Sequence, residues 1–143
     1  MKSDKGSASL EFIAAGVLLI VPLIYLVLVL GRIQAGTLAA ESIARQAVRV
    51  YFTAPSPAQA NARVSLAAQD GLADFHFAPE DATTTVSCVP LASPCLRAES
   101  TVTFTQKITV RLPFVPAILG LEKFAFVTVT GQASQRVALG AGL

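Results

Sequence analysis

The sequence feature that most limits the fold of this chain is an uncharged apolar run near its N-terminus. Phe12 to Leu30 are nineteen residues without a charged side chain. In a helix, at about 1.5 Å per residue, such a run approaches the ~30 Å thickness of the hydrocarbon core of a bilayer. Only 14% of all residues are charged, which agrees with a chain that lies partly in lipid. We therefore predict a transmembrane helix over residues 7–30.

Charges on the two sides of the run give a first orientation. Lys2 and Lys5 precede it, and a short positive flank is typical of the cytoplasmic side of a membrane helix. Arg32, Arg45 and Arg49 follow it and weaken this argument. A cleavable secretory signal is an alternative, but its apolar region usually has about 7–15 residues and its cleavage site follows that region. We expect a single-pass protein of the cytoplasmic membrane, with a cytoplasmic N-terminus and an extracytoplasmic C-terminal domain.

A single carboxylate, Glu11, lies directly before the run. An ionisable side chain at the edge of a membrane segment is costly, so we interpret it as a functional site that needs a partner. If the chain were cut after Gly6, Ser7 would become the N-terminus and Glu11 the fifth residue. A carboxylate and an ammonium that leave water together lose less when they are paired. In the simpler alternative, Glu11 only extends to the lipid headgroups at the end of a signal anchor.

This junction resembles that of type IV prepilins. The shared features are a short basic leader that ends in Gly6, a glutamate five residues past the cut, and the apolar helix behind it. The resemblance implies that residues 1–6 are a leader and that a membrane-embedded prepilin peptidase cleaves between Gly6 and Ser7 and methylates the new amine. It also implies that Glu11 pairs with that amine, from its own or a neighbouring subunit.

Pro22 lies in the middle of the run. It removes the backbone hydrogen bond to the carbonyl of Leu18 and should bend or loosen the helix locally. Membrane helices tolerate proline, so an incidental kink is one interpretation. The resemblance to type IV pilins implies another, a segment that stretches when the subunit leaves the bilayer.

Beyond the run, the residues predict an α+β fold. Residues 31–55 continue the helix with one polar and one apolar side and end in a linker, and the apolar stripe needs the rest of the chain as its cover. Ser56 is a good N-cap with Pro57 at the first helical position, which predicts a short second helix that ends near Asp74. Residues 56–143 would form the extracytoplasmic domain.

Three segments alternate with a period of two and predict a three-stranded antiparallel sheet. The first begins at Thr83, the second runs from Thr101 to Leu112, and the third from Lys123 to Arg136. Gln106 alone interrupts the apolar face of the second strand, which indicates a bulge or the rim of the sheet. We expect residues 137–143 to be a loose tail.

Two cysteines, Cys88 and Cys95, enclose six residues between the first two strands. Outside the membrane an oxidised pair is the economical interpretation, and it would clip the turn between these strands. A metal site would need more ligands, and His76 is the only histidine. We predict a structural role for His76, which lies between two phenylalanines, and no cofactor.

Residues 113–121 are apolar but broken by two prolines and a glycine, which excludes a central strand. An exposed patch here would need a partner. Its candidate residues are Phe114, Val115, Ile118 and Leu119.

The order of these elements is similar to that of TadE-like pseudopilins of the tight-adherence (Flp) type IV pilus system. The resemblance covers most of the chain, but only the Gly6 to Glu11 junction and the span are specific. Major Flp pilins are very short and usually have a tyrosine after the glutamate, whereas this chain has Phe12 and a full domain, which favours a minor component. The resemblance implies as partners other pilins, the prepilin peptidase and the inner-membrane assembly platform. The net charge of +2 gives no reason to expect nucleic acid.

Three functions compete. The first is a non-enzymatic pseudopilin that primes, caps or regulates a thin pilus or a related secretion machine. The second is an unprocessed, signal-anchored binding domain that recognises a ligand through its sheet. The third is an enzyme, which the sequence disfavours because it contains no nucleophile elbow, phosphate loop or metal cluster. The grouping of Asp74, His76 and Asp81 has no evident nucleophile beside it.

Overall fold

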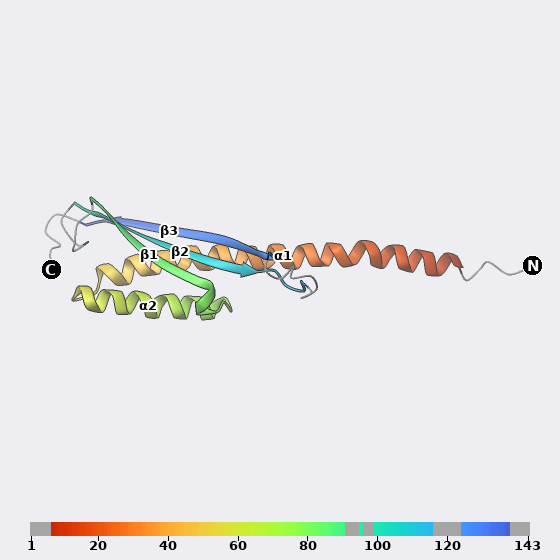
Figure 1. Ribbon diagram of the computed structural model, residues 1–143, viewed down its shortest axis with the longest axis horizontal. Coiled ribbons are helices and arrows are strands. Elements are labelled where there is room, and N and C mark those ends of the chain that lie inside the picture. Colours follow the sequence, from red (N-terminus) through yellow and green to blue (C-terminus); the bar gives the residue numbers. More distant parts are fainter. Residues whose placement is uncertain (1–6, 91–94, 96–98, 116–123, 138–143) are drawn as a thin grey trace, which may run out of the picture.

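A single long helix, α1, runs along the whole molecule, and the other elements pack along its second half (Figure 1). The computed structural model describes residues 7–90, 95, 99–115 and 124–137. Its elements follow in the order α1 (Ser7–Phe52), α2 (Pro57–Asp74), a 3-10 turn (Pro79–Asp81), β1 (Ala82–Val89), β2 (Thr101–Arg111) and β3 (Phe126–Arg136). The predicted α+β fold, with a long helix, a short helix and a three-stranded antiparallel sheet, is confirmed.

α1 joins the apolar run and the amphipathic segment into one helix of 46 residues, about 69 Å long at 1.5 Å per residue. Pro22 lies inside it without ending it. Beyond the run, the buried face of α1 consists mainly of small side chains, which lets other backbones approach closely. Its buried residues are Gly36, Ala39, Ala40, Ile43, Ala44, Ala47, Val48 and Tyr51.

α2 begins where the sequence predicts it. Ser56 has an extended backbone, and its side chain accepts a hydrogen bond from the Gln59 amide, while Pro57 occupies the first helical position. One face of α2 packs against α1, and its buried residues are spaced by four: Ala60, Val64, Ala68 and Leu72. The predicted cover for the apolar stripe of α1 is therefore α2 together with the sheet.

The sheet has the order β1-β2-β3, with both pairs antiparallel. Val102, Phe104, Ile108 and Val110 of β2 are buried, as the alternation predicts. β3 begins at Phe126, so the predicted start at Lys123 is too early: Phe124 and Ala125 precede the strand, and Lys123 lies outside the described residues.

The prediction that Gln106 marks a bulge or the rim of the sheet is wrong. β2 is the central strand, and its pairing continues through Gln106, opposite Thr84 on β1 and Gly131 on β3. The side chain is 1% exposed, and its Oε1 accepts a 2.5 Å hydrogen bond from Thr84 Oγ1. A cross-strand hydroxyl thus allows a polar side chain on the buried face.

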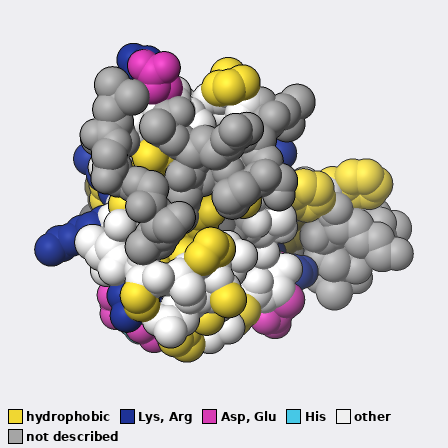
Figure 2. All heavy atoms as spheres, turned by 90° about the vertical axis from the view of Figure 1, so that its left-hand side faces the viewer, with side chains coloured by type: hydrophobic (Ala, Val, Ile, Leu, Met, Phe, Trp, Pro, Cys, Tyr) yellow, Lys and Arg dark blue, Asp and Glu magenta, His cyan; other side chains and the backbone are white. Residues whose placement is uncertain are grey.

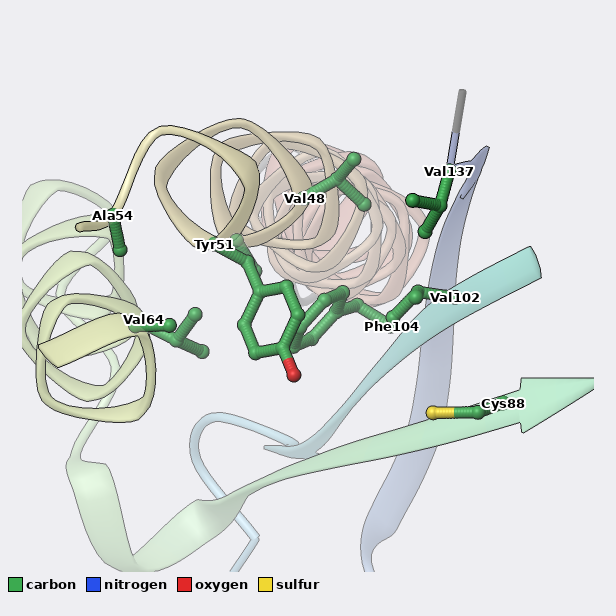
Figure 3. Packing of buried hydrophobic residues seen from close by; sticks show 10 residues of the cluster. Val48, Tyr51, Ala54, Val64, Cys88, Val102, Phe104 and Val137 are labelled. Atoms are coloured by element: carbon green, nitrogen blue, oxygen red, sulfur yellow. The ribbon is translucent and has the colours of Figure 1, made fainter. Parts of the chain in front are cut away.

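The core lies between the helices and the sheet in two clusters. At the end far from the apolar run, Tyr51 of α1 meets Phe104 of β2 edge to face, with ring centroids 5.2 Å apart (Figure 3). Val137 belongs to this cluster and is 2% exposed, which corrects the prediction of a loose tail at this residue; residues 138–143 lie outside the described part. Backbone hydrogen bonds with Glu99 and Ser100 hold Val137 there.

The second cluster, nearer the apolar run, gathers around Ile43, Leu72, Phe77 and Ile108. At Gly131, β3 approaches the backbone of α1 beside Ala40, which belongs to this second cluster. A Cβ atom at this glycine would lie 2.2 Å from the carbonyl carbon of Ala40. Only glycine permits such a close approach.

Candidate functional site

Among the described residues, no other element buries the apolar side chains of residues 10–30 of α1. We call this segment the bare half of α1. Its large hydrophobic residues are exposed on every side, in contrast to the one-sided burial of the second half. α1 is thus long and apolar enough to cross a membrane, and its membrane-length segment is not the buried core of a soluble domain, because none of it is buried. The exposed residues are Leu10, Phe12, Ile13, Val17, Leu18, Leu19, Ile20, Val21, Leu23, Ile24, Tyr25, Leu26, Val27, Leu28 and Leu30.

Glu11 lies in the first turns of this helix, and its side chain is exposed. Among the described residues, no ion pair or side-chain hydrogen bond is found for it. Only one side of the predicted processing site can be placed: Ser7 is the first residue of α1, and Gly6 lies outside the described residues. The partner of Glu11 and the cleavage therefore stay predictions.

Pro22 is exposed on the same bare part of α1. It lines a shallow apolar surface of the helix together with Ala14, Leu18 and Val21. The helix continues on both sides of it. Its suggested role in stretching stays a prediction, because a single conformation does not test it.

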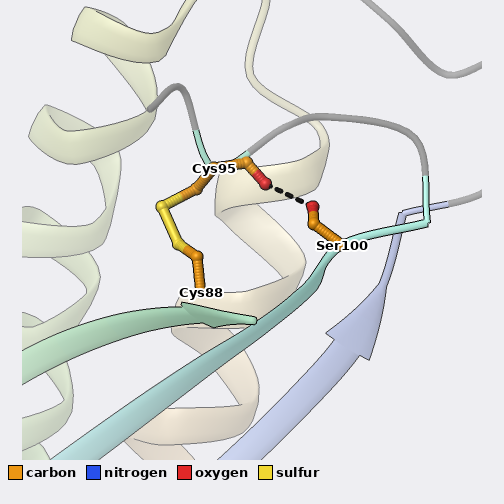
Figure 4. The surroundings of a disulfide bond; sticks show 3 residues. All are labelled: Cys88, Cys95 and Ser100. Carbon is orange, nitrogen blue, oxygen red and sulfur yellow. Dashed lines mark hydrogen bonds between the residues drawn. A yellow bond between two sulfur atoms is a disulfide. The ribbon is translucent and has the colours of Figure 1, made fainter. Parts of the chain in front are cut away.

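The predicted disulfide is present. Cys88 ends the buried face of β1, and Cys95 lies in the connection to β2, with Cα atoms 5.7 Å apart. The Ser100 hydroxyl, at the entrance to β2, donates a 2.7 Å hydrogen bond to the Cys95 carbonyl oxygen (Figure 4). The disulfide thus links the end of β1 to the β1–β2 connection, at the end of the sheet far from the apolar run.

The predicted partner patch is only partly described. Phe114 is 81% exposed, Val115 is half-buried, and Ile118 and Leu119 lie outside the described residues. Two further exposed aromatic residues, Phe124 at 82% and Phe126 at 50%, were missed by the sequence reasoning. The sequence placed both in a strand expected from Lys123; in the structure Phe124 precedes β3 and Phe126 is its first residue. Three phenylalanines around one strand connection were nevertheless visible in the sequence.

A groove of about 340 Å³ lies between α2 and β1. β1 is an edge strand, and Thr84 and Val86 are exposed toward this side. Gln106 lines the groove from β2, and its Nε2 has no hydrogen-bond partner among the described residues. The sequence signal for this feature was the single polar residue on the apolar face of β2.

Three ion pairs join charged side chains of the described residues, and each has at least one exposed member. Arg111 donates to Asp81 with Nη2–Oδ1 and Nε–Oδ1 distances of 2.6 and 3.1 Å. These hydrogen bonds, and the attraction between the two charges, raise the pKa of the Arg111 guanidinium. Arg45 pairs with Glu41 one helical turn earlier, as their spacing predicts. Of the Asp74, His76 and Asp81 grouping, Asp81 is thus paired with Arg111, and the His76 side chain is exposed.

Within the described ranges, no cluster of three or more His, Cys, Asp or Glu side chains is arranged to hold a metal ion.

The far end of the domain, seen in Figure 2, mixes hydrophobic side chains with charged and other polar atoms on its coloured surface. The bare helix and the apolar residues at the β2–β3 end are therefore the main hydrophobic surfaces of the described chain.

No family model, curated protein or solved structure matches this chain. Its class consequently rests on the fold and on the bare helix. The chain is an α+β protein with one N-terminal helix that is long and apolar enough to anchor it in a membrane.

Proposed function

We propose that this chain is a minor, TadE-like pseudopilin of a tight-adherence type IV pilus or a related secretion machine. In this function it is a non-enzymatic assembly component that a prepilin peptidase cleaves after Gly6. The proposal rests on one observation: the two halves of the continuous helix α1 have different surroundings. The apolar half is exposed, whereas α2 and the sheet pack against the other half.

The bare half supplies the packing surface of the proposed function. In the membrane its side chains face lipid, and after extraction they bury one another in a bundle of apolar helices from several subunits. The second half of α1 is not free to do so on its small-residue face, because the Gly131 backbone of β3 and the side chains of α2 already occupy that face. Neighbouring subunits would therefore meet mainly through residues 10–30.

Glu11 would set the register of that packing. An exposed carboxylate at the start of a helix that enters a bundle needs a cation, and the new α-amine of a cleaved chain is one. Removing one member of a desolvated ion pair costs roughly 3–5 kcal/mol, which corresponds to more than a 100-fold loss in association. The disulfide supports the extracytoplasmic location of the domain, because such bonds persist in oxidising compartments.

Two experiments test the proposal. N-terminal sequencing of the protein made beside its peptidase should show Ser7 as the first residue, and an intact leader of residues 1–6 would argue strongly against it. Cross-linking between subunits through the bare helix should be lost in Glu11→Gln. The matched control is Glu41→Gln, which removes an exposed intramolecular pair with Arg45 and should leave association unchanged.

One observation favours a second candidate, an unprocessed signal-anchored binding domain. The groove between α2 and β1 contains the buried Nε2 donor of Gln106 and an open strand edge, which together suit a ligand with a carbonyl acceptor. In this function Glu11→Gln would have no effect. Filling the groove with Val86→Trp would abolish binding, whereas the pseudopilin proposal expects assembly to tolerate it.

A further inference from the structure

The end of the sheet that points along α1 toward the apolar run carries a cluster of exposed aromatic residues. We call it the membrane-facing tip and define it as Phe114, Phe124 and Phe126 together with the half-buried Pro113. A backbone hydrogen bond of 2.9 Å from the Leu112 amide to the Ala125 carbonyl closes this end between β2 and β3. Figure 1 shows it beside the middle of α1, where the bare half of the helix begins.

The tip lies at the level of the last turn of the apolar run. It shares a shallow hollow of about 400 Å³ with that turn; the helix side of the hollow is formed by Val27, Leu28, Gly31 and Arg32, and the tip side by Pro113 and Phe114. Glu11 and Arg32 bracket twenty uncharged residues, about 30 Å of helix, which matches the hydrocarbon core. A bilayer placed on these residues therefore reaches the tip.

The tip is also the most exposed apolar surface of the folded domain that is described. The side chains of Phe114 and Phe124 are 81% and 82% exposed, and Phe126 is 50% exposed. Other exposed hydrophobic residues of the domain, such as Leu66 and Val86, are separate from one another on α2 and β1. In water such a cluster of large aromatic side chains is unfavourable, whereas the headgroup region of a bilayer accepts aromatic rings.

The backbone conformation of Phe114 supports a functional role for its exposure. Its φ is +58°, in the left-handed region that bulky side chains rarely adopt. A residue held in that region is a reason to look for a function that the strain serves. Nearby, the guanidinium of Arg32 lies 5.2 Å from the Phe77 ring centroid. Arg32 follows the apolar run directly, and a long basic side chain at the end of a membrane helix can extend to the headgroups.

We propose that the membrane-facing tip inserts into the outer interface of the same bilayer that α1 crosses. The domain then has two contacts with the membrane, the helix and the tip, and these fix its tilt and its rotation about α1. This inference rests on the membrane anchoring in the proposed function, but not on cleavage or on pilus assembly.

The chain contains no tryptophan, so a single introduced indole reports its own surroundings. The full chain is reconstituted in phosphatidylcholine vesicles with and without brominated acyl chains, in the variants Phe114→Trp and Phe124→Trp. Leu18→Trp, in the middle of the run, is the positive control. Leu66→Trp is the negative control, because Leu66 shares a hollow with Gln46, about 22 Å along the helix beyond Gly31.

We expect the brominated lipids to quench most of the emission at positions 114, 124 and 18, and to leave position 66 unchanged. Iodide in the buffer should quench only position 66. If position 18 is quenched while 114 and 124 are quenched by iodide alone, the inference is wrong and the anchoring stands. Shielding of 114 and 124 from both quenchers would also overturn it, because a protein would then cover the tip. If position 18 itself escapes the brominated lipid, the anchoring fails too.

Discussion

Gly131→Ala should push β3 away from α1 and lower the stability of the domain, and the contacts at Gly131 indicate by how much. The new Cβ would lie 2.2 Å from the Ala40 carbonyl carbon, 2.4 Å from its oxygen and 2.4 Å from the Glu41 nitrogen. All three are backbone atoms, so no rotamer change relieves the contact. Ordinary van der Waals contact begins at 3.4 Å, so the new Cβ would be 1.2 Å too close to the carbonyl carbon. β3 must therefore retreat from α1 by about this distance.

A retreat of this size loosens the packing of the buried neighbours of β3 as well. Overpacking a close-packed core costs about 1–3 kcal/mol, and a clash with rigid backbone belongs at the upper end, about 3 kcal/mol. For a domain of this size that corresponds to a fall of roughly 10–25 °C in the unfolding temperature. The assay is thermal proteolysis of the full chain in detergent micelles, followed by mass spectrometry of the tryptic cut after Lys107 in the central strand.

Gly31→Ala is the matched control, because a Cβ there meets nothing within 4 Å. It should leave the unfolding temperature unchanged or raise it slightly, since alanine is the better helix former by about 1 kcal/mol. If Gly131→Ala unfolded at the wild-type temperature, the close approach of β3 to α1, and with it the argument that the small-residue face of α1 is occupied, would be refuted.

Three further predictions use the same assay. Phe104→Ala should cost about 3–5 kcal/mol, because the ring is 2% exposed, whereas Phe124→Ala, at 82% exposure, should cost little; equal losses would contradict the assigned core. Cys88→Ser together with Cys95→Ser should cost about 2 kcal/mol, the small value expected for a short loop, and no loss would show the bond to be irrelevant to stability. Gln106→Leu should be neutral or stabilising, because it removes a buried Nε2 without a described partner; a loss above about 2 kcal/mol would refute this.

The parts of the fold that the sequence predicted depend on local signals. Ser56 and Pro57 mark the start of α2 because the cap acts on amides within one turn. The alternation in β2 predicted its buried face, because side chains of a strand alternate whatever the strand packs against. The length of the apolar run likewise needs no tertiary information to indicate a membrane helix.

The errors occurred where residues distant in sequence decide the outcome. Gln106 is central because β1 and β3 pair on both sides of β2, and its side chain can be buried because Thr84, on the neighbouring strand, provides a hydroxyl. Val137 is buried because backbone groups at Glu99 and Ser100 hold it. Gly131 was an ordinary glycine in the sequence, and its importance follows from the proximity of Ala40, ninety-one residues earlier. No local pattern reports such contacts.

The two halves of α1 divide its roles by side-chain size. In the half beyond the apolar run, alanines and Gly36 form a face so flat that the sheet packs directly on it, which leaves the polar side with the Glu41–Arg45 pair toward solvent. In the bare half, large aliphatic side chains project in all directions, and no single face is reserved for the domain itself. A partner that binds this chain through α1 outside lipid must therefore displace the sheet or accept a charged surface. The bare half, Glu11 and the membrane-facing tip are then the surfaces from which association can gain most.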